Sequence, residues 1–428
     1  QIERDRIIHT PISRKLTEKY QVLYDGQRKV VRNYSTHVNR LVQVTRAICR
    51  WLDLNADFAE SIALGSKVGS LPFIHASKPA VESWTRKKLL ELDNEYVDRD
   101  PEAKPKELKQ MELDFEGATL PHWLHALRSP RMLRRVQQYI PWAAGHKVDK
   151  SFCTGQQAYW MLAVNPFCLS SRRNNFSRET MYGIWRHSLG STVGPRTFRH
   201  RIELPKSPGR LEVSFENATY ESVVVSYADD ITWVIENLND ANTAALLNGR
   251  RSRFNALLAE LGQDAPSALQ AGLTHSNTGS IYHYFINDFN ENSERVLQGI
   301  AKGYVGRAGL REGDQKALIG LSEEGQRQLE KMKNFLREAV FGELRIRSRN
   351  EMLKTVSEAC LKVLYQGKDD LLPNYINDKA NVEGWAEEPR QEALRLLKDD
   401  VHRVQLTVSI FCEMGDHEIY DLVGIESL

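Results

Sequence analysis

The sequence predicts a mainly α-helical fold with one small β-hairpin and long helices toward the C-terminus. The first observation is the helical spacing of apolar residues, which is clearest at Leu41, Val44 and Ile48. The second is that strand-like alternation of apolar and polar residues is best developed within residues 197–216. The third is an amphipathic pattern through about 320–428, which predicts a C-terminal helical part.

In the N-terminal half, residues 1–25 are expected to begin a helix, and residues 36–52 and about 57–65 to form two more. Residues 91–118 are charged and contain two prolines, which predicts a surface insertion or loop. Residues 152–164 are apolar and predict another helix.

The stretch Ile62–Ser77 joins the end of the helix over 57–65 to a tight turn. Gly69 and Pro72 break the helix here, because neither residue continues a helix well. A helix end followed by a tight turn can direct side chains into a pocket, so we expect the functional site to be organised around this stretch.

Residues 220–247 predict a long helix that carries Asp229 and Asp230. Because neighbouring residues on a helix face different directions, only one of these carboxylates can point inward. Trp233, one turn later, is expected to be a core or pocket-wall residue, with stacking on a nucleobase as the alternative.

The C-terminal part predicts three helices and a connector. Ser322 can cap a helix that runs to about residue 349, and a second helix is expected over about 351–366. Residues 367–389 predict a polar connector, and a last helix is expected over about 390–412.

Composition limits the class of protein. A chain of 428 residues is long enough for two domains or one, and no strong internal boundary is visible, so residues 1–428 are predicted to form a single large domain. The 58 basic and 56 acidic side chains give a net charge of +2, which argues against wholesale coating of nucleic acid. The five cysteines show no metal or redox spacing, and no apolar run approaches the roughly 20 residues that span a bilayer. With a charged N-terminus unlike a signal peptide, the sequence predicts a cytoplasmic protein without a membrane partner.

A basic run within residues 121–140 allows two interpretations. Its members are Arg128, Arg131, Arg134 and Arg135, preceded by His122, Trp123 and His125. The simpler interpretation is a solvated helix face. The alternative is a patch for phosphate or single-stranded nucleic acid, because guanidinium groups pair with phosphates in a forked geometry.

Several short motifs occur in order along nearly the whole chain. They are Glu3–His9, Arg14–Leu16, Tyr20–Val22, Thr36–His37, Ala63–Ala76, Gly183–Ser188, Pro208–Gly209, Ala228–Ile231 and Met414–Asp416. In order and spacing, the chain resembles the dGTPase branch of the HD-domain phosphohydrolases, the deoxynucleoside triphosphate (dNTP) triphosphohydrolases. The resemblance implies an HD-domain helical fold.

The resemblance also implies a divalent metal such as Mn, Fe or Mg, held by a lone His, a His-Asp pair and a later Asp. Here His37 matches the lone His and Asp229 the later Asp, but Ser66 and Lys67 stand at the pair. A serine hydroxyl is a poor ligand and a charged ammonium is none, so the metal site is expected to be incomplete. Lys67 is expected to place its charge near the metal position and to pair with Asp229.

Other departures from the family pattern surround the same pocket. His75 matches the catalytic histidine and is kept, whereas Lys78 replaces the carboxylate that works with it. Tyr34 replaces a phosphate-binding arginine, and Trp233 replaces a tyrosine of the sugar site. Gln21 matches a sugar-contacting glutamine and is kept.

Three functional hypotheses follow. The first is a divergent dNTP triphosphohydrolase, with His75, Lys67 and Lys78 as catalytic candidates and Gln21, Tyr34, Trp233 and Arg186 as nucleotide-binding candidates. It would cleave a dNTP to deoxynucleoside and tripolyphosphate, in control of dNTP pools or in anti-phage dNTP depletion. The alternative is an inactive nucleotide-sensing pseudoenzyme that works with a partner subunit, and the third is a binder of single-stranded nucleic acid. The resemblance also implies a homo-oligomer.

Overall fold

The computed structural model describes residues 2–20, 32–99, 127, 132, 135, 136, 140, 152–163, 176–187, 201–203, 212–214, 219–247, 251–301, 319–366, 371–383 and 387–424.

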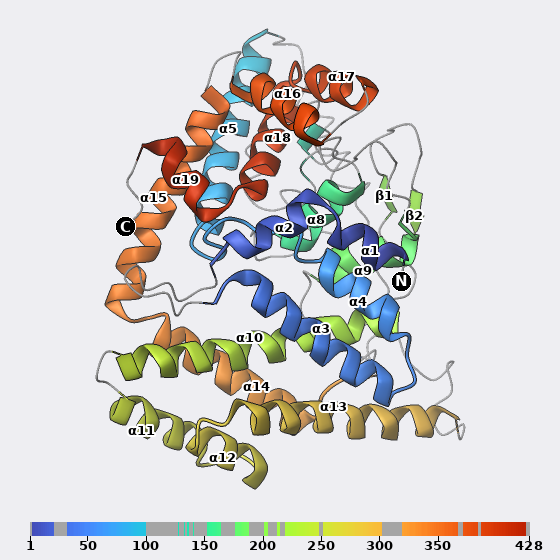
Figure 1. Ribbon diagram of the computed structural model, residues 1–428, viewed down its shortest axis with the longest axis vertical. Coiled ribbons are helices and arrows are strands. Elements are labelled where there is room, and N and C mark those ends of the chain that lie inside the picture. Colours follow the sequence, from blue (N-terminus) through green and yellow to red (C-terminus); the bar gives the residue numbers. More distant parts are fainter. Residues whose placement is uncertain are drawn as a thin grey trace.

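The described residues are almost wholly helical (Figure 1), so the mainly α prediction is confirmed. The first half contains α1 (Ile2–Ile8), α2 (Pro11–Lys15), the 3₁₀ turn η1 (Leu16–Glu18), α3 (Tyr34–Trp51), α4 (Ala56–Gly65), α5 (Lys78–Arg99), α8 (Thr154–Ala163) and α9 (Arg178–Arg186). The second half contains α10 (Tyr220–Leu247), α11 (Arg251–Leu261), α12 (Ser267–Thr274), α13 (Thr278–Ala301), α14 (Glu323–Phe335), the π-helical turn η4 (Leu336–Val340), α15 (Leu344–Gln366), α16 (Leu371–Glu383), α17 (Glu387–Leu396), α18 (Asp400–Glu413) and α19 (Asp416–Val423).

Two short strands form the predicted hairpin. Strand β1 (Arg201–Glu203) pairs antiparallel with β2 (Glu212–Ser214), and Ile202 lies opposite Val213. The hairpin lies at the edge of the helical body in Figure 1. The helices predicted over 152–164 and 220–247 are also confirmed, as α8 and α10.

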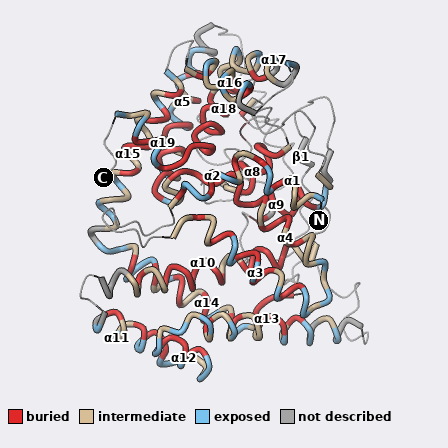
Figure 2. Tube along the Cα trace, in the orientation of Figure 1, coloured by how far each residue is buried: buried red, intermediate tan, exposed pale blue. Residues whose placement is uncertain are grey.

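Two buried apolar clusters hold the helices together. One lies among α3, α4 and α10–α14, which form the lower layers of Figure 1. The other lies among α5, α8, α9, α15, α16, α18 and α19, and its buried residues are red in the upper part of Figure 2. Leu64 packs against both clusters, and Val68 and Leu71 belong to the second. The stretch Ile62–Ser77 therefore passes from one core to the other.

Within residues 1–25, where a helix was expected to begin, the chain forms two short helices. Helix α1 ends at Ile8, and Thr10 caps a separate helix α2 by accepting a hydrogen bond from the Ser13 N–H. The Thr10 hydroxyl also donates to the Ile7 carbonyl at 2.7 Å, and Pro11 suits the first turn of a helix. The helices expected over 36–52 and 57–65 are confirmed as α3 and α4, and each begins after an asparagine cap.

The surface insertion predicted over 91–118 is wrong for its first nine residues. Helix α5 continues to Arg99, and Leu92 and Asp93 are buried at 4% and 1% exposure. The sequence pattern did not reveal this part of α5, because charged residues surround its narrow buried face. Residues 100–118 lie outside the described part of the chain, as do His122, Trp123, His125 and the basic run apart from Arg135. Arg135 forms an ion pair with Asp399.

The helix predicted from Ser322 starts as expected but ends earlier. The Ser322 side chain accepts a hydrogen bond from the Gly325 N–H, yet α14 stops at Phe335 instead of near residue 349. A Cβ atom on Gly342 would lie 2.4 Å from the Glu338 carbonyl oxygen, so the tight turn before α15 requires glycine.

The polar connector predicted over 367–389 and the single helix over 390–412 are also wrong. Leu372, Ile376 and Ala380 recur every four residues and are buried, so residues 371–383 form helix α16. Helices α17 and α18 are separate because the Asp399 carboxylate accepts hydrogen bonds from the Val401 and His402 N–H groups and starts α18. Along the described part of the chain, no helix is both long and apolar enough to cross a bilayer.

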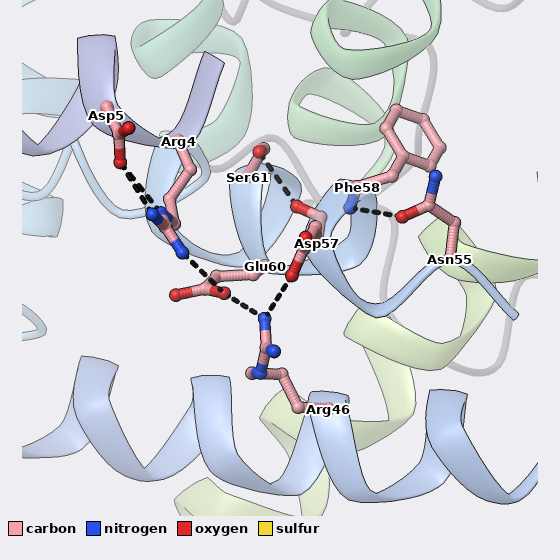
Figure 3. A network of polar contacts seen from close by, with 8 residues as sticks. All are labelled: Arg4, Asp5, Arg46, Asn55, Asp57, Phe58, Glu60 and Ser61. Atoms are coloured by element: carbon pink, nitrogen blue, oxygen red, sulfur yellow. Dashed lines mark hydrogen bonds and ion pairs between the residues drawn. The ribbon is translucent and has the colours of Figure 1, made fainter. Parts of the chain in front are cut away.

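A network of charges near the chain start joins α1, α3 and α4 (Figure 3). Arg46 of α3 donates to Asp57 at 2.7 Å and also to Glu60 of α4. Arg4 of α1 pairs with Asp5 at 2.8 Å and lies 3.8 Å from Glu60.

Replacement of Arg46 with alanine is expected to lower the melting temperature by only about 2 °C or less, because the side chains of its ion pairs are 13% to 49% exposed and water screens partly exposed pairs. Thermal unfolding at low and high salt measures this. Arg50→Ala is the matched control, since Arg50 is an exposed arginine of the same helix. A loss several times larger that persists in 1 M salt contradicts the expectation.

Candidate functional site

Asp229 of α10 is the centre of a cluster of four polar side chains from four parts of the chain. Its Oδ1 atom lies 2.7 Å from Lys67 Nζ and 3.2 Å from His37 Nε2. Its Oδ2 atom lies 3.1 Å from His187 Nε2, which is itself 3.0 Å from Lys67 Nζ. The structure thus brings together His37, Lys67 and Asp229, as the sequence predicted, and adds His187.

The local fold explains why Lys67 points into this cluster and Ser66 does not. Ser66 follows the last residue of α4, is fully buried, and donates its hydroxyl to the Ala63 carbonyl at 2.9 Å. Its oxygen is therefore occupied in closing the helix. Two residues after Lys67, a Cβ on Gly69 would lie 2.4 Å from the Ala158 nitrogen, so only glycine allows the turn to pack this closely on α8.

The Lys67–Asp229 contact is an ion pair at neutral pH. Burial raises the pKa of Asp229, but the charge of Lys67, followed by the contact with His187, lowers it much further, well below its usual value. Burial lowers the pKa of Lys67, and the Asp229 charge more than compensates, so its pKa is raised overall. Lys67 is only 5% exposed, so this pair is screened little by water.

The two histidines of the cluster are neutral. Burial, opposed by Asp229, lowers the pKa of His37, and burial with the charge of Lys67 lowers that of His187. His37 can donate its Nε2–H to Asp229. The neutral His187 ring either accepts from Lys67 or donates to Asp229 through the same Nε2 atom, so it makes one of these contacts at a time.

This cluster does not fit a divalent metal. The space between His37, His187 and Asp229 holds the Lys67 ammonium, which repels a cation and already occupies the carboxylate. Among the described residues, no group of three or more His, Cys, Asp or Glu side chains is arranged to hold a metal ion. The positions that the resemblance assigns to a metal are therefore taken by an internal cation.

His75 and Trp233 form a second pair close to this cluster. The Trp233 indole N–H donates to His75 Nε2 at 3.3 Å, and Trp233 packs on Phe341 with ring centres 5.8 Å apart. His75 is exposed. Partial loss of hydration, followed by the charges of Lys78 and Lys67, lowers the pKa of His75, so the ring is neutral at pH 7.

Comparison with known proteins finds similar chains. No family model matches the chain. A "Deoxyguanosinetriphosphate triphosphohydrolase-like protein" of Wolinella succinogenes is 22% identical over 392 residues, which cover 90% of this chain and 87% of that protein. Proteins with the same description from Azoarcus sp. and Caulobacter vibrioides are 40% and 42% identical over 83 and 80 residues, about a fifth of this chain and 22% and 20% of their own lengths.

Over most of its length, the chain is therefore similar to a protein described as deoxyguanosinetriphosphate triphosphohydrolase-like. The stronger identities span only about a fifth of the length of the relatives that show them.

The remaining predicted site residues are placed as follows. Tyr34 is buried and stacks on His37, with ring centres 5.4 Å apart. Lys78 is the first residue of α5 and is half-buried. Asp230 points away from the cluster and pairs with Lys333 at 3.0 Å, so Asp229 is the inward carboxylate, as predicted. Gln21 and the side chain of Arg186 lie outside the described part of the chain.

Sequence reasoning missed the role of His187 and one wall of the pocket beside His75. The motif Gly183–Ser188 was recognised, but nothing in it shows that His187 contacts Lys67, 120 residues away. The pocket is also lined by residues of the C-terminal helices, including Arg349 of α15 and His417 and Tyr420 of α19. The helix α19 was not predicted, so these residues could not be assigned.

Proposed function

We propose that this protein binds a dNTP in the pocket lined by His75, next to Trp233, with Lys67 supplying the positive charge that a metal supplies in the pattern of the dNTP triphosphohydrolases. The observation that carries the proposal is the buried Lys67 ammonium, 2.7 Å from Asp229, at the position of the His-Asp pair. Similarity to a protein described as deoxyguanosinetriphosphate triphosphohydrolase-like supports a nucleotide as the ligand.

The charges and rings around the pocket suit such a ligand. Asp229 compensates part of the Lys67 charge, both neighbouring histidines are neutral, and Lys78 adds a second positive charge near His75, so the charge available to a triphosphate is positive. Trp233 and Phe341 provide aromatic surface for a sugar or base. The four-residue cluster supports binding without metal.

A second candidate function is hydrolysis of the bound dNTP, favoured by the neutral ring of His75. A neutral imidazole can accept a proton from an attacking water. Attack at the α-phosphorus breaks its bond to the 5′ oxygen, which takes up a proton, and yields deoxynucleoside and tripolyphosphate. Such an activity would serve control of dNTP pools or their depletion during phage infection. Without it, the protein is a nucleotide sensor.

Four further points stay predictions. They are assembly into a homo-oligomer, a partner subunit, a cytoplasmic location and binding of single-stranded nucleic acid. The basic run that motivated nucleic-acid binding lies outside the described residues apart from Arg135, which is ion-paired.

In the presence of EDTA, at least one dNTP is expected to bind the wild-type protein. Lys78→Ala is expected to weaken binding about fivefold at low salt, since a positive charge that acts at His75 is lost. Calorimetric titration with each dNTP measures the affinities. Lys87→Ala is the matched control, because Lys87 is an exposed lysine of the same helix.

If none of the dNTPs binds the wild-type protein without metal, the proposal fails. If Lys87→Ala weakens binding as much as Lys78→Ala, the attraction is a general surface effect. Release of deoxynucleoside and tripolyphosphate by the wild-type protein, lost in His75→Ala, separates the enzyme from the sensor.

A further inference from the structure

Asp416 joins two distant parts of the chain beneath the pocket. It is the first residue of α19 and is only 1% exposed. One carboxylate oxygen accepts a hydrogen bond from the Tyr20 N–H at 2.9 Å, and the other accepts from the Phe73 N–H at 2.8 Å. A single side chain therefore holds two backbone segments side by side.

Lys19 connects the same three segments a second time. It is fully buried, and its Nζ atom donates to the Ser70 carbonyl at 2.6 Å and to the Cys412 carbonyl. Lys19 and Tyr20 are neighbours, as are the turn residues Ser70 and Phe73. The segments 19–20, 70–73 and 412–416 thus form one buried polar junction.

The turn held by this junction has an unfavourable backbone conformation. Phe73 and Ile74 have φ angles of 50° and 42°, a region that non-glycine residues rarely occupy. Such conformations persist only where surrounding contacts fix them. The hydrogen bond from the Phe73 N–H to Asp416 is one of those contacts, and His75 comes two residues later.

Both segments held by Asp416 also line the pocket. Tyr20, Phe73 and His75 line it together with Tyr420 and His417 of α19. The Tyr20 hydroxyl lies 3.2 Å from His417 Nε2, and the Phe73 and Tyr420 rings lie 5.3 Å apart. The pocket walls are therefore built on the junction.

We propose that Asp416 is a positioning residue that fixes the distance between the Tyr20 segment and the His75 turn, and so sets the opening of the pocket. Asp416 does not touch the ligand in this role. It acts through the backbone N–H groups of Tyr20 and Phe73. The identity of the ligand rests on the proposed function, whereas the positioning itself does not.

The test compares Asp416→Asn with Asp421→Asn, which makes the same substitution at an exposed site on the same helix. Asparagine keeps one acceptor oxygen and turns a donor toward the other amide, so at least one of the Tyr20 and Phe73 amides is expected to exchange hydrogen about tenfold faster. Asp421→Asn is expected to leave both amides unchanged.

The position of the turn is read from Trp233. In protein labelled with 5-fluorotryptophan, the Trp233 resonance, assigned with Trp233→Phe, is expected to shift in Asp416→Asn and not in Asp421→Asn, because the indole N–H contacts His75. A general loss of stability moves the other tryptophan signals as well. A shift centred on Trp233 therefore reports the turn.

Unchanged amide exchange and an unchanged Trp233 signal in Asp416→Asn overturn the proposal. The proposal is also overturned if the Tyr20 and Phe73 amides of the wild-type protein exchange hydrogen at unprotected rates. This second measurement does not depend on whether a variant folds. If Asp416→Asn loosens the turn and weakens dNTP binding about tenfold, the result supports both the positioning role of Asp416 and the proposed function. A loosened turn in a protein that never binds a dNTP supports the positioning and rejects the proposed function.

Discussion

The double variant Ser66→His with Lys67→Asp is expected to gain a metal-dependent stability that the wild-type protein lacks. The change replaces the ammonium with a carboxylate near His37 Nε2 and Asp229 Oδ1, which are 3.2 Å apart, and puts a longer imidazole side chain at position 66, where the serine hydroxyl now closes α4. Without metal, two neighbouring carboxylates repel each other, so the melting temperature falls below that of the wild-type protein. With Mn²⁺ at about 100 times its Kd, binding adds about 2.7 kcal/mol.

The measurement is the melting temperature against Mn²⁺ concentration. The matched control is Ser66→His with Lys67→Asn, which has nearly the same volume but lacks the second carboxylate and is expected to respond much less. Turnover of dNTPs by the double variant with Mn²⁺ would show in addition that the rest of the pocket still supports catalysis. Equal responses of both variants and the wild-type protein contradict the assignment of the pair to residues 66 and 67.

Lys67→Met is expected to destabilise the protein by about 3 kcal/mol at pH 8, because it leaves the Asp229 carboxylate without its cation. Because Asp229 is 22% exposed, the loss of stability is expected toward the lower end of the range for broken buried ion pairs. Lys87→Met, on the exposed face of α5, is the control and is expected to change the free energy of unfolding little.

The loss of folding stability in Lys67→Met is expected to depend on pH. In the wild-type protein the pKa values of His37 and His187 are lowered from the ordinary 6.5, so the unfolded chain binds more protons and stability rises as the pH rises toward that value. Without Lys67, one cause that lowers the pKa values of His37 and His187 is gone, whereas Asp229, which raises them, remains. The folded variant then takes up protons more readily, so its deficit is smaller at pH 5.5 than at pH 8. Urea unfolding at both pH values measures this, and a deficit that is larger at pH 5.5 contradicts it.

Much of the fold could be predicted because its helices have strong local signals. Helices α3 and α4 combine helical apolar spacing with asparagine caps, and both were predicted to within two residues at each end. Helix α16 was missed because its buried face is only one residue wide in each turn, while polar residues surround it. The break between α17 and α18 depends on the side chain of Asp399, which also reads as an ordinary charged helix residue.

The site could be predicted where a sequence motif identified a side chain. It could not be predicted where a contact involves the backbone of a distant residue. The approach of Lys67 to Asp229 followed from aligned motifs and charge. The contact of Lys67 with His187 depends on how α9 packs against α4. The partners of Asp416 are backbone N–H groups, which every residue except proline carries, so no residue pattern reports them.

The junction at Asp416 has a consequence for synthesis of the protein. Asp416 and Tyr20 are 396 positions apart in the chain. A nascent chain that still lacks residue 416 holds Tyr20, the His75 turn and the Asp229 cluster but not the carboxylate that aligns the first two. Contacts this distant in sequence form late in folding because a large loop must close first. Under the proposed function, binding of a dNTP is therefore expected to begin only after α19 has docked.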